Sequence, residues 1–244
     1  MKKMFLVLIC LGGAFSAGYF LSGRVYSAFV KVYYERINQK AFASDMAEFR
    51  QIVREADYSD DKFIKLFRRL HGYSPENKEL NAAGAVYYAE FAGNLSESFI
   101  HLEKALGRDK GDLVLLDKII PFYFDAGCYQ DISYILSLYE SDLNGKLMYY
   151  AMVSLYKSGN YDRAIRIFTK AEKKNLCNAE MYFYAGIVGE KLSSGDKKKL
   201  SAAMLNFEKA FFMEKSKEEY ADSLIRVYLK LGMKGKAAKI AGIK

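Results

Sequence analysis

Histidine and cysteine carry much of the nucleophilic, acid–base and metal chemistry of proteins, and this chain of 244 residues has few of them. Its only histidines are His71 and His101, and its only cysteines are Cys10, Cys128 and Cys177. Neither histidine has a second ligand at the short spacing that zinc sites use. No catalytic group of nucleophile, base and carboxylate can be assembled around them. We therefore expect no catalytic residue, no metal site and no cofactor, and we predict that the chain is not an enzyme.

The basic run Lys197-Lys198-Lys199 is the other candidate for ligand chemistry. Serine, glycine and aspartate precede it, and these residues are typical of turns. We expect the three lysines in a solvated loop between two helices. A contact with a phosphate or a lipid headgroup is the alternative.

Charge is unevenly distributed along the chain, whose net charge is +8. Residues 1–40 hold six basic side chains and one acidic one, residues 191–244 hold thirteen and six, and residues 41–190 are net acidic. The basic last part could contact anionic lipid, an acidic partner or nucleic acid. The sequence has no zinc-finger spacing, no basic recognition-helix pattern and no aromatic RNA-binding motif, so we expect no nucleic-acid partner.

The N-terminus has the order of a targeting segment. Lys2 and Lys3 precede residues 4–23, which contain no charged side chain. As a helix rising about 1.5 Å per residue, twenty residues cover ~30 Å, the thickness of one hydrocarbon core. Apolar residues also continue past the first small residues of the segment. We therefore predict that residues 1–23 are a retained signal anchor, which places the chain at a membrane through residues 4–23.

Two alternatives for this segment stay open. A small-x-small sequence ends at Ser16, so a signal peptide could be cleaved before Ala17. Cys10 could instead carry a lipid. The basic flank of the apolar run favours a cytoplasmic N-terminus, with the rest of the chain outside. We therefore expect a bacterial inner-membrane protein whose main part lies in the periplasm, or alternatively an exported periplasmic protein.

A repeat near 34 residues runs through most of the chain. Gly93, Gly127 and Gly159 are 34 and 32 residues apart, and Ala105 and Ala171 are separated by 66, which is two periods of 33. Repeats of this length are typical of helical hairpins that stack on their neighbours. The sequence therefore predicts a binding protein built from repeats rather than a domain built around one catalytic pocket.

The residues within the repeat identify its class. Ala164 with Phe168 and Ala203 with Phe207 keep a spacing of four residues, and another alanine follows three residues later in both cases. An alanine lets a neighbouring helix approach closely, and a phenylalanine one turn later fills the space beside it. Residues 79–244 therefore resemble the tetratricopeptide repeat (TPR) family. The resemblance implies an all-α fold, a right-handed α-solenoid of TPR-like helical hairpins.

Four segments follow from these patterns. They are a signal anchor or signal peptide (1–23), a helical stalk (24–42), a helical hairpin that acts as a cap or degenerate repeat (43–75), and about five TPR-like repeats (79–244).

The resemblance also implies a binding site, because the first helix of each hairpin lines a concave groove in this family. We expect a protein or peptide partner there, with aromatic contacts in the middle of the groove and basic ones toward its C-terminal end. The residues carried over are Tyr87, Glu90, Phe91, Asp117, Phe124, Asp125, Tyr149, Val153, Tyr156, Lys157, Phe183, Glu190, Lys191, Asp222, Arg226 and Lys230. The apolar end of the chain near Ile240 and Ala241 could also mediate self-association.

The function that these features favour is a membrane-tethered scaffold for protein–protein interaction. It would hold a partner in a bacterial envelope assembly of the secretion, pilus, flagellar-motor or outer-membrane-assembly type. The alternative is a periplasmic chaperone-like or regulatory module that captures peptides transiently in the groove.

The fate of the N-terminal segment can be measured directly. If residues 1–23 are a retained anchor, the intact mass of the protein extracted from membranes will include them, because no signal peptidase has removed the apolar run. A mature mass that starts at Ala17, or a lipid adduct on Cys10, would contradict this prediction.

Overall fold

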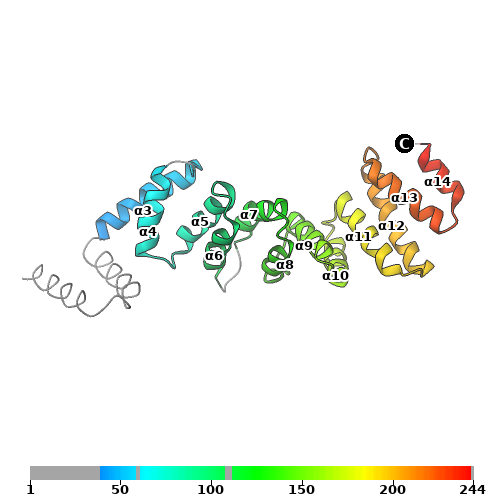
Figure 1. Ribbon diagram of the computed structural model, residues 1–244, viewed down its shortest axis with the longest axis horizontal. Helices are drawn as coiled ribbons and strands as arrows, with labels where there is room; N and C mark the ends of the chain where they lie inside the picture. The colour runs from blue at the N-terminus through cyan, green and yellow to red at the C-terminus, as the bar shows by residue number, and fades with distance from the viewer. Residues whose placement is uncertain (1–38, 59–60, 108–111, 243–244) are drawn as a thin grey trace, which may run out of the picture. The chain divides into compact units, whose positions relative to one another are not determined.

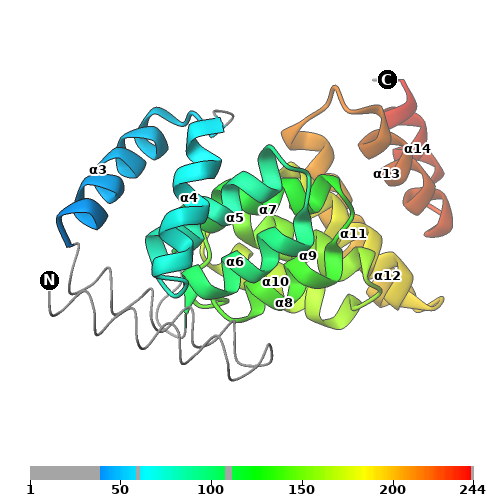
Figure 2. The ribbon, with the colours of Figure 1, turned by 60° about the vertical axis from the view of Figure 1, so that its left-hand side comes forward.

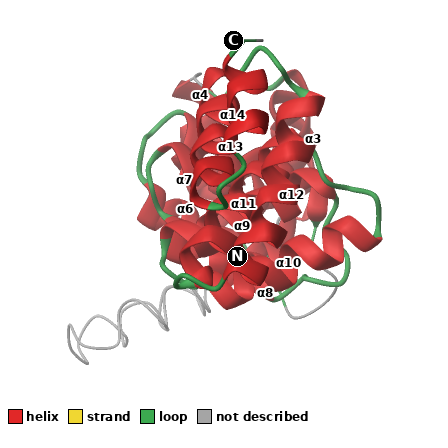
Figure 3. Cartoon of the chain, turned by 90° about the vertical axis from the view of Figure 1, so that its right-hand side faces the viewer, coloured by secondary structure: helices red, strands yellow, loops and turns green. Residues whose placement is uncertain are grey.

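The computed structural model describes residues 39–58, 61–107 and 112–242 of the chain. Every regular element in these residues is an α-helix, which confirms the all-α prediction (Figure 3). Among the described helices, none is both long enough and apolar enough to span a bilayer. Residues 4–23, which we predict to be the anchor, and most of the predicted stalk at 24–42 lie outside the described residues.

The chain divides into two compact units at Gly107, and each is described here by itself. The described helices of the first unit are α3 (Gln39–Glu55), α4 (Asp61–Tyr73), α5 (Lys78–Glu90) and α6 (Leu95–Leu106). Helices α3 and α4 form a hairpin joined at one end, in blue and cyan in Figure 2. Helix α3 begins at Gln39, so the boundary that we expected at residue 42 falls inside this helix.

The first unit is held together by a cluster of aromatic rings. The Phe63 ring stacks on Phe49 at 5.7 Å and on Phe67 at 5.8 Å between ring centroids. Helix α5 approaches these rings closely at Gly84, where an added Cβ would lie 2.7 Å from Cζ of Phe67 and 3.1 Å from Cγ of His101. The absence of a side chain at this position therefore allows α4, α5 and α6 to pack against one another.

The second unit contains eight helices in its described part (Figure 1). They are α7 (Leu113–Asp125), α8 (Tyr129–Ser137), α9 (Gly145–Lys157), α10 (Tyr161–Lys173), α11 (Ala179–Ser193), α12 (Lys197–Met213), α13 (Glu218–Lys230) and α14 (Lys234–Ala241). Each odd-numbered helix pairs with the next helix in a hairpin, and the first helices α7, α9 and α11 also contact one another in sequence.

Ion pairs show that the second helices of neighbouring hairpins also lie side by side. Lys209 of α12 pairs with Glu172 of α10 at 2.8 Å, and Lys236 of α14 pairs with Glu208 of α12 at 3.7 Å. The unit therefore has two sides. We call the side formed by α7, α9, α11 and α13 the first-helix face, and the side formed by α8, α10, α12 and α14 the second-helix face.

Glycines with a positive φ mark the turn inside each hairpin of the second unit. Gly159 has a φ of +79°, a conformation that residues with a side chain rarely adopt, and it joins α9 to α10. Gly127 has the same role between α7 and α8, with a φ of +76°. The residue after the glycine is hydrogen-bonded to the preceding helix, because Asn160 N donates to the carbonyl oxygen of Leu155 in α9 at 2.8 Å. The glycine period in the sequence is thus the period of these turns.

The alanine and phenylalanine positions of the repeat are buried at the helix contacts. Ala164 and Ala171 are fully buried in α10, and Phe168 between them meets Tyr182 of α11 edge to face at 5.4 Å. Phe207 of α12 is fully buried in the same way. These residues therefore pack where the sequence predicts that helices cross.

The basic run Lys197-Lys198-Lys199 lies in a helix, and our expectation of a loop is wrong. Asp196 caps the start of α12, where its Oδ1 accepts hydrogen bonds from the backbone N–H groups of Lys198 at 2.8 Å and Lys199 at 3.3 Å. The extra residues of this repeat extend α12 to 17 residues instead of lengthening the turn.

Gly186 offers a direct test of the close packing. An added Cβ there would lie 2.7 Å from the Phe207 ring, so Gly186→Ala should lower the free energy of unfolding by about 1–3 kcal/mol through overpacking. Gly235→Ala is the matched control, because no atom lies within 4 Å of its added Cβ in α14. The control should be neutral or stabilising by up to about 1 kcal/mol. Urea unfolding followed by circular dichroism measures both, and equal effects would contradict the packing described.

Candidate partner-binding surface

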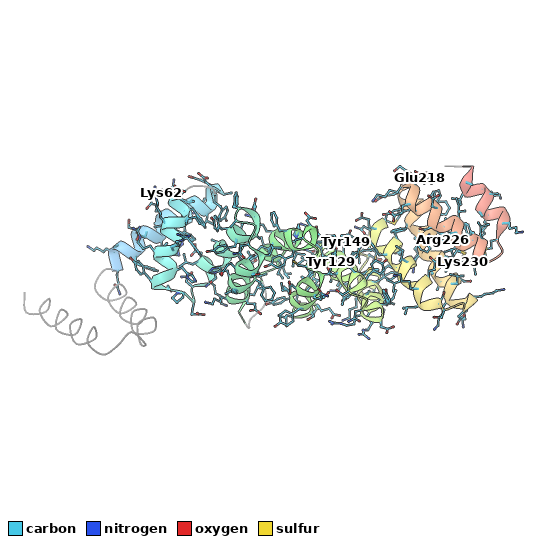
Figure 4. The ribbon with its side chains drawn as sticks, in the orientation of Figure 1. Lys62, Tyr129, Tyr149, Glu218, Arg226 and Lys230 are labelled. Carbon is cyan, nitrogen blue, oxygen red and sulfur yellow. The ribbon has the colours of Figure 1, made fainter. Side chains whose placement is uncertain are left out.

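A row of partly exposed aromatic side chains crosses the second unit, along the first helices and the starts of two second helices. We call it the aromatic strip, and its residues are Phe124 of α7, Tyr129 of α8, Tyr149, Tyr150 and Tyr156 of α9, Tyr161 of α10 and Tyr184 of α11. Figure 4 labels Tyr129 and Tyr149, which come from neighbouring helices. Five consecutive helices therefore contribute to one surface.

The position of α9 fixes the middle of the strip. Asn144 caps α9 by accepting a hydrogen bond from Leu147 N at 2.9 Å, and its Nδ2 donates to Oδ2 of Asp117 in α7 at 2.7 Å. Lys146 Nζ also donates to the backbone oxygen of Asp117 at 3.0 Å. These bonds tie the start of α9 to α7. Tyr149 and Tyr156 then share one side of α9, because they are seven residues apart.

The rings of the strip touch one another in sequence. The Phe124 ring lies 5.0 Å from Tyr150 and 5.5 Å from Tyr129 between centroids. Tyr184 continues the row, 6.5 Å from Tyr149 and 5.5 Å from Tyr156. Phe124 meets Tyr129 and Tyr150 edge to face, at angles of 75° and 62° between the ring planes, and Tyr184 is tilted against Tyr149 and Tyr156 at 58° and 50°. Each ring is thus supported by its neighbours.

Lys191 lies at one end of the strip, next to the rings of Tyr156 and Tyr161. Its Nζ lies 5.1 Å from the centroids of both Tyr156 and Tyr161, and it donates a hydrogen bond to Oη of Tyr161 at 3.2 Å. That hydrogen bond raises the pKa of Lys191, so the ammonium group is charged at neutral pH. Lys157 Nζ also lies over the Tyr156 ring, 5.8 Å from its centroid. Both lysines make cation–π contacts that place positive charge at the edge of the aromatic surface.

Three tyrosine hydroxyls of the strip, those of Tyr149, Tyr150 and Tyr184, are held in the protonated form. Burial raises the pKa of Tyr149, Tyr150 and Tyr184, and the nearby carboxylate of Glu180 raises all three further. Asp125 adds to the effect at Tyr150. At neutral pH the strip therefore presents neutral hydroxyl groups that can donate hydrogen bonds to a partner.

Two of the residues that we expected in a groove lie in the core instead. Val153 is 0% exposed and Phe183 is 4% exposed. The Phe183 ring stacks on Tyr220 at 4.6 Å and meets Phe207 at 5.8 Å, so it fills the space between α11, α12 and α13. The exposed position on α11 belongs to the next residue, Tyr184.

The basic end that we expected for the groove is largely neutralised. Glu190 accepts hydrogen bonds from Arg226 Nη2 at 2.9 Å and from Lys230 Nζ at 2.7 Å; Figure 4 labels both basic residues on α13. Burial alone would raise the pKa of Glu190, but these hydrogen bonds and charges outweigh it and lower the pKa. The group therefore joins α11 to α13, and only Lys157 and Lys191 remain as positive groups on the strip.

Three other expected residues belong to the first unit. The exposed Phe91 ring stacks on Tyr58 at 5.6 Å, and Tyr87 packs against Phe63 at 5.4 Å. Glu90 at the end of α5 is exposed. These residues belong to the first unit, and of the residues that we expected in a groove the aromatic strip contains Phe124, Tyr149 and Tyr156.

The structure brings together two histidines that have no neighbouring ligand in the sequence. His71 of α4 and His101 of α6 lie 5.0 Å apart between ring centroids. His101 Nδ1 is 2.8 Å from Oδ1 of the fully buried Asn81. The two histidines are 30 residues apart, close to one repeat, and that spacing was the available signal for their contact.

The surroundings of the histidine pair favour neutral imidazoles. Burial lowers the pKa of His101 to about 4, with the adjacent His71 and Lys104 adding to the effect. Burial and Lys104 also lower the pKa of His71, while Asn81, Glu76 and the backbone of Pro75 oppose this change. At neutral pH both rings are therefore uncharged, and His101 is held by its hydrogen bond with Asn81.

Because of the histidine pair, we expect the stability of the first unit to decrease at acid pH. An imidazole whose pKa is lower in the folded than in the unfolded chain contributes stability above the unfolded value of 6.5, and this is lost as the pH falls toward about 4. Hydrogen exchange of peptides from α4–α6 should therefore be faster at pH 5 than at pH 7, after correction for the intrinsic rate. His101→Gln should reduce this pH dependence, and an unchanged dependence would contradict the role of the pair.

Comparison with known proteins gives a fold. No protein-family model matches the chain. No curated protein matches it either. Two solved structures of MamA AMB-1 are similar, both at 17% identity and over 68% of this chain, with 88% and 95% of the MamA chains covered and TM-scores of 0.53 and 0.52. MamA MSR-1 is similar at 18% identity over 68% of this chain and 93% of its own, with a TM-score of 0.51. The chain thus has a TPR-like helical repeat fold.

Proposed function

We propose that this protein is a non-enzymatic scaffold that binds a protein partner through the aromatic strip of its second unit. The observation that carries the proposal is the strip itself: seven partly exposed rings from five helices, in contact with one another, with Lys191 held between two of them. The similarity to TPR-like structures supports the fold on which the strip is built.

The physical chemistry of the strip suits a protein ligand. Tyrosine side chains supply large contact areas at a low cost in conformational entropy, and they are enriched among residues that dominate binding energy. The ring contacts immobilise these side chains before a partner arrives, which further reduces the entropy lost on binding. The neutral hydroxyls can then pair with backbone groups of an extended or helical segment.

Charges at the edges of the strip would orient the segment. Lys157 and Lys191 lie beside Tyr156, whereas Asp125 and Glu180 lie near Tyr150. A partner with apolar anchors flanked by an acidic group at one end and a basic group at the other would match this arrangement.

The setting that we propose follows from the N-terminal sequence. The uncharged residues 4–23 after two lysines support a tether to a bacterial inner membrane, with the helical units in the periplasm. The scaffold would then serve an envelope assembly. A chaperone-like or regulatory module that captures peptides transiently on the same strip is the alternative.

These two functions differ in the number and lifetime of the complexes formed. A scaffold should co-purify with one defined partner in a fixed ratio after mild detergent extraction. A chaperone-like module should bind many unrelated peptides, each weakly and with fast release. Quantitative mass spectrometry of proteins bound to the full chain separates the two outcomes.

The double variant Tyr156→Ala with Tyr184→Ala tests the strip. Both rings are partly exposed and in mutual contact, so their removal should weaken capture of the co-purified partner at least tenfold while helix content is kept. Isothermal titration calorimetry measures the affinity. Tyr134→Ala is the matched control, because this exposed tyrosine lies on α8 outside the strip. A double variant that binds normally, or a control that loses binding equally, would contradict the proposal.

A further inference from the structure

We propose that the second-helix face of the last three hairpins is a binding surface for an anionic lipid bilayer. This face differs from the aromatic strip, which reaches the second helices only at the starts of α8 and α10. The proposal rests on the distribution of charge between the two layers of helices, on exposed apolar side chains that lie among the charges, and on the contacts that keep the helices side by side.

The two layers of the last three hairpins differ strongly in charge. The second helices α10, α12 and α14 together carry eleven basic and three acidic side chains, a net charge of +8. The first helices α9, α11 and α13 carry five basic and five acidic side chains, with no net charge. The positive charge of this part of the chain is thus concentrated on one layer.

Most of this charge is available to a ligand. Three of the eleven basic residues, Lys170, Lys209 and Lys236, form ion pairs with acidic residues. The pairs of Lys209 and Lys236 bridge the three helices and hold them next to one another. The other eight make no ion pair with any residue in the described part of the chain; they are Arg163, Arg166, Lys173, Lys197, Lys198, Lys199, Lys234 and Lys239.

Apolar side chains are exposed within the same layer. Leu205 and Phe212 of α12 are 53% and 57% exposed, and a spacing of seven residues places them on one side of the helix. Lys198 lies one heptad before Leu205 and Lys209 lies between the two, so apolar and basic groups alternate along this side. Met213, at the end of α12, is also exposed.

This combination matches the surface of an anionic bilayer. Helices that lie in the interface place leucine and phenylalanine below the headgroups and keep lysines among the phosphates. Each lysine near the surface adds electrostatic attraction to anionic lipid. A phosphate backbone of nucleic acid would satisfy the lysines but would give no favourable environment to Leu205 and Met213. The bilayer is therefore the occupant that satisfies both kinds of group.

The chain provides a clean reporter for this interaction because it contains no tryptophan. Phe212→Trp in the full-length chain places a single fluorophore on the proposed surface. Its emission should shift to shorter wavelength with vesicles of phosphatidylglycerol and phosphatidylcholine, and brominated acyl chains should quench it at least twofold. Vesicles of phosphatidylcholine alone should produce neither effect. Leu205→Trp is a second reporter if the first variant does not fold.

A control reporter distinguishes binding through this surface from attachment of the chain to the vesicle through residues 4–23. Val114→Trp places the fluorophore at the start of α7, on the first-helix face. Val114 itself is 81% exposed. This reporter should not shift or be quenched, even when the chain is attached to the vesicle at its N-terminus. Equal quenching of both reporters, or no response of Phe212→Trp to the anionic vesicles, would overturn the proposal.

Charge reversal tests the electrostatic part. Lys198→Glu with Lys239→Glu, in the Phe212→Trp chain, should abolish most of the shift, and so should high salt, because both weaken attraction to the headgroups. Lys65→Glu with Arg68→Glu makes the same change in net charge at exposed positions of the first unit and should leave the shift unchanged. An unaffected shift in the first variant would overturn the proposal. A response to duplex DNA in place of vesicles would also overturn it, in favour of nucleic acid.

Discussion

The close approach of helices at residues with little or no side chain is the constraint on which the rest of the structure depends. In the second unit the Phe207 ring lies directly over Gly186, and in the first unit Phe67 and His101 lie over Gly84. Because the ring of one helix rests on the backbone of another, each helix has a fixed rotation about its axis. That rotation decides which side chains are buried and which are presented to partners. The aromatic strip and the basic layer are both consequences of it.

The two layers of the second unit have separate chemistry. The first helices of the last three hairpins carry balanced charge, and most rings of the aromatic strip lie on first helices, which suits a protein segment that is desolvated on binding. The second helices carry excess positive charge and isolated apolar side chains, which suit a wet, anionic surface. Ion pairs within each layer, such as Glu190 with Arg226 on one side and Glu172 with Lys209 on the other, hold neighbouring hairpins together. A scaffold of this kind could bind a partner and lie on a membrane at the same time.

The sequence predicted the helical hairpins well because their turns and crossings require particular residues. Gly159 is needed for a positive φ, and Ala171 is needed where helices meet, so both leave a periodic signal. The exposed aromatic surface was predicted less well, because one residue along a helix turns a side chain by about 100°. Phe183 and Tyr184 are adjacent and both aromatic, yet only Tyr184 reaches the surface. Likewise, the contact of His71 with His101 depends on the packing of α4 against α6 around Gly84 of α5, which residue spacing alone does not specify.

Photo-crosslinking tests the central claim most directly, because it reports which residues lie against a partner in the intact protein. Benzoyl-phenylalanine would replace either Tyr184 of the aromatic strip or the exposed Tyr134 of α8, in chains expressed in the native host. We predict a crosslink to one defined protein from position 184 and none from position 134. A crosslink to the same protein only from position 134, or no crosslink from position 184 in a folded chain, would contradict it.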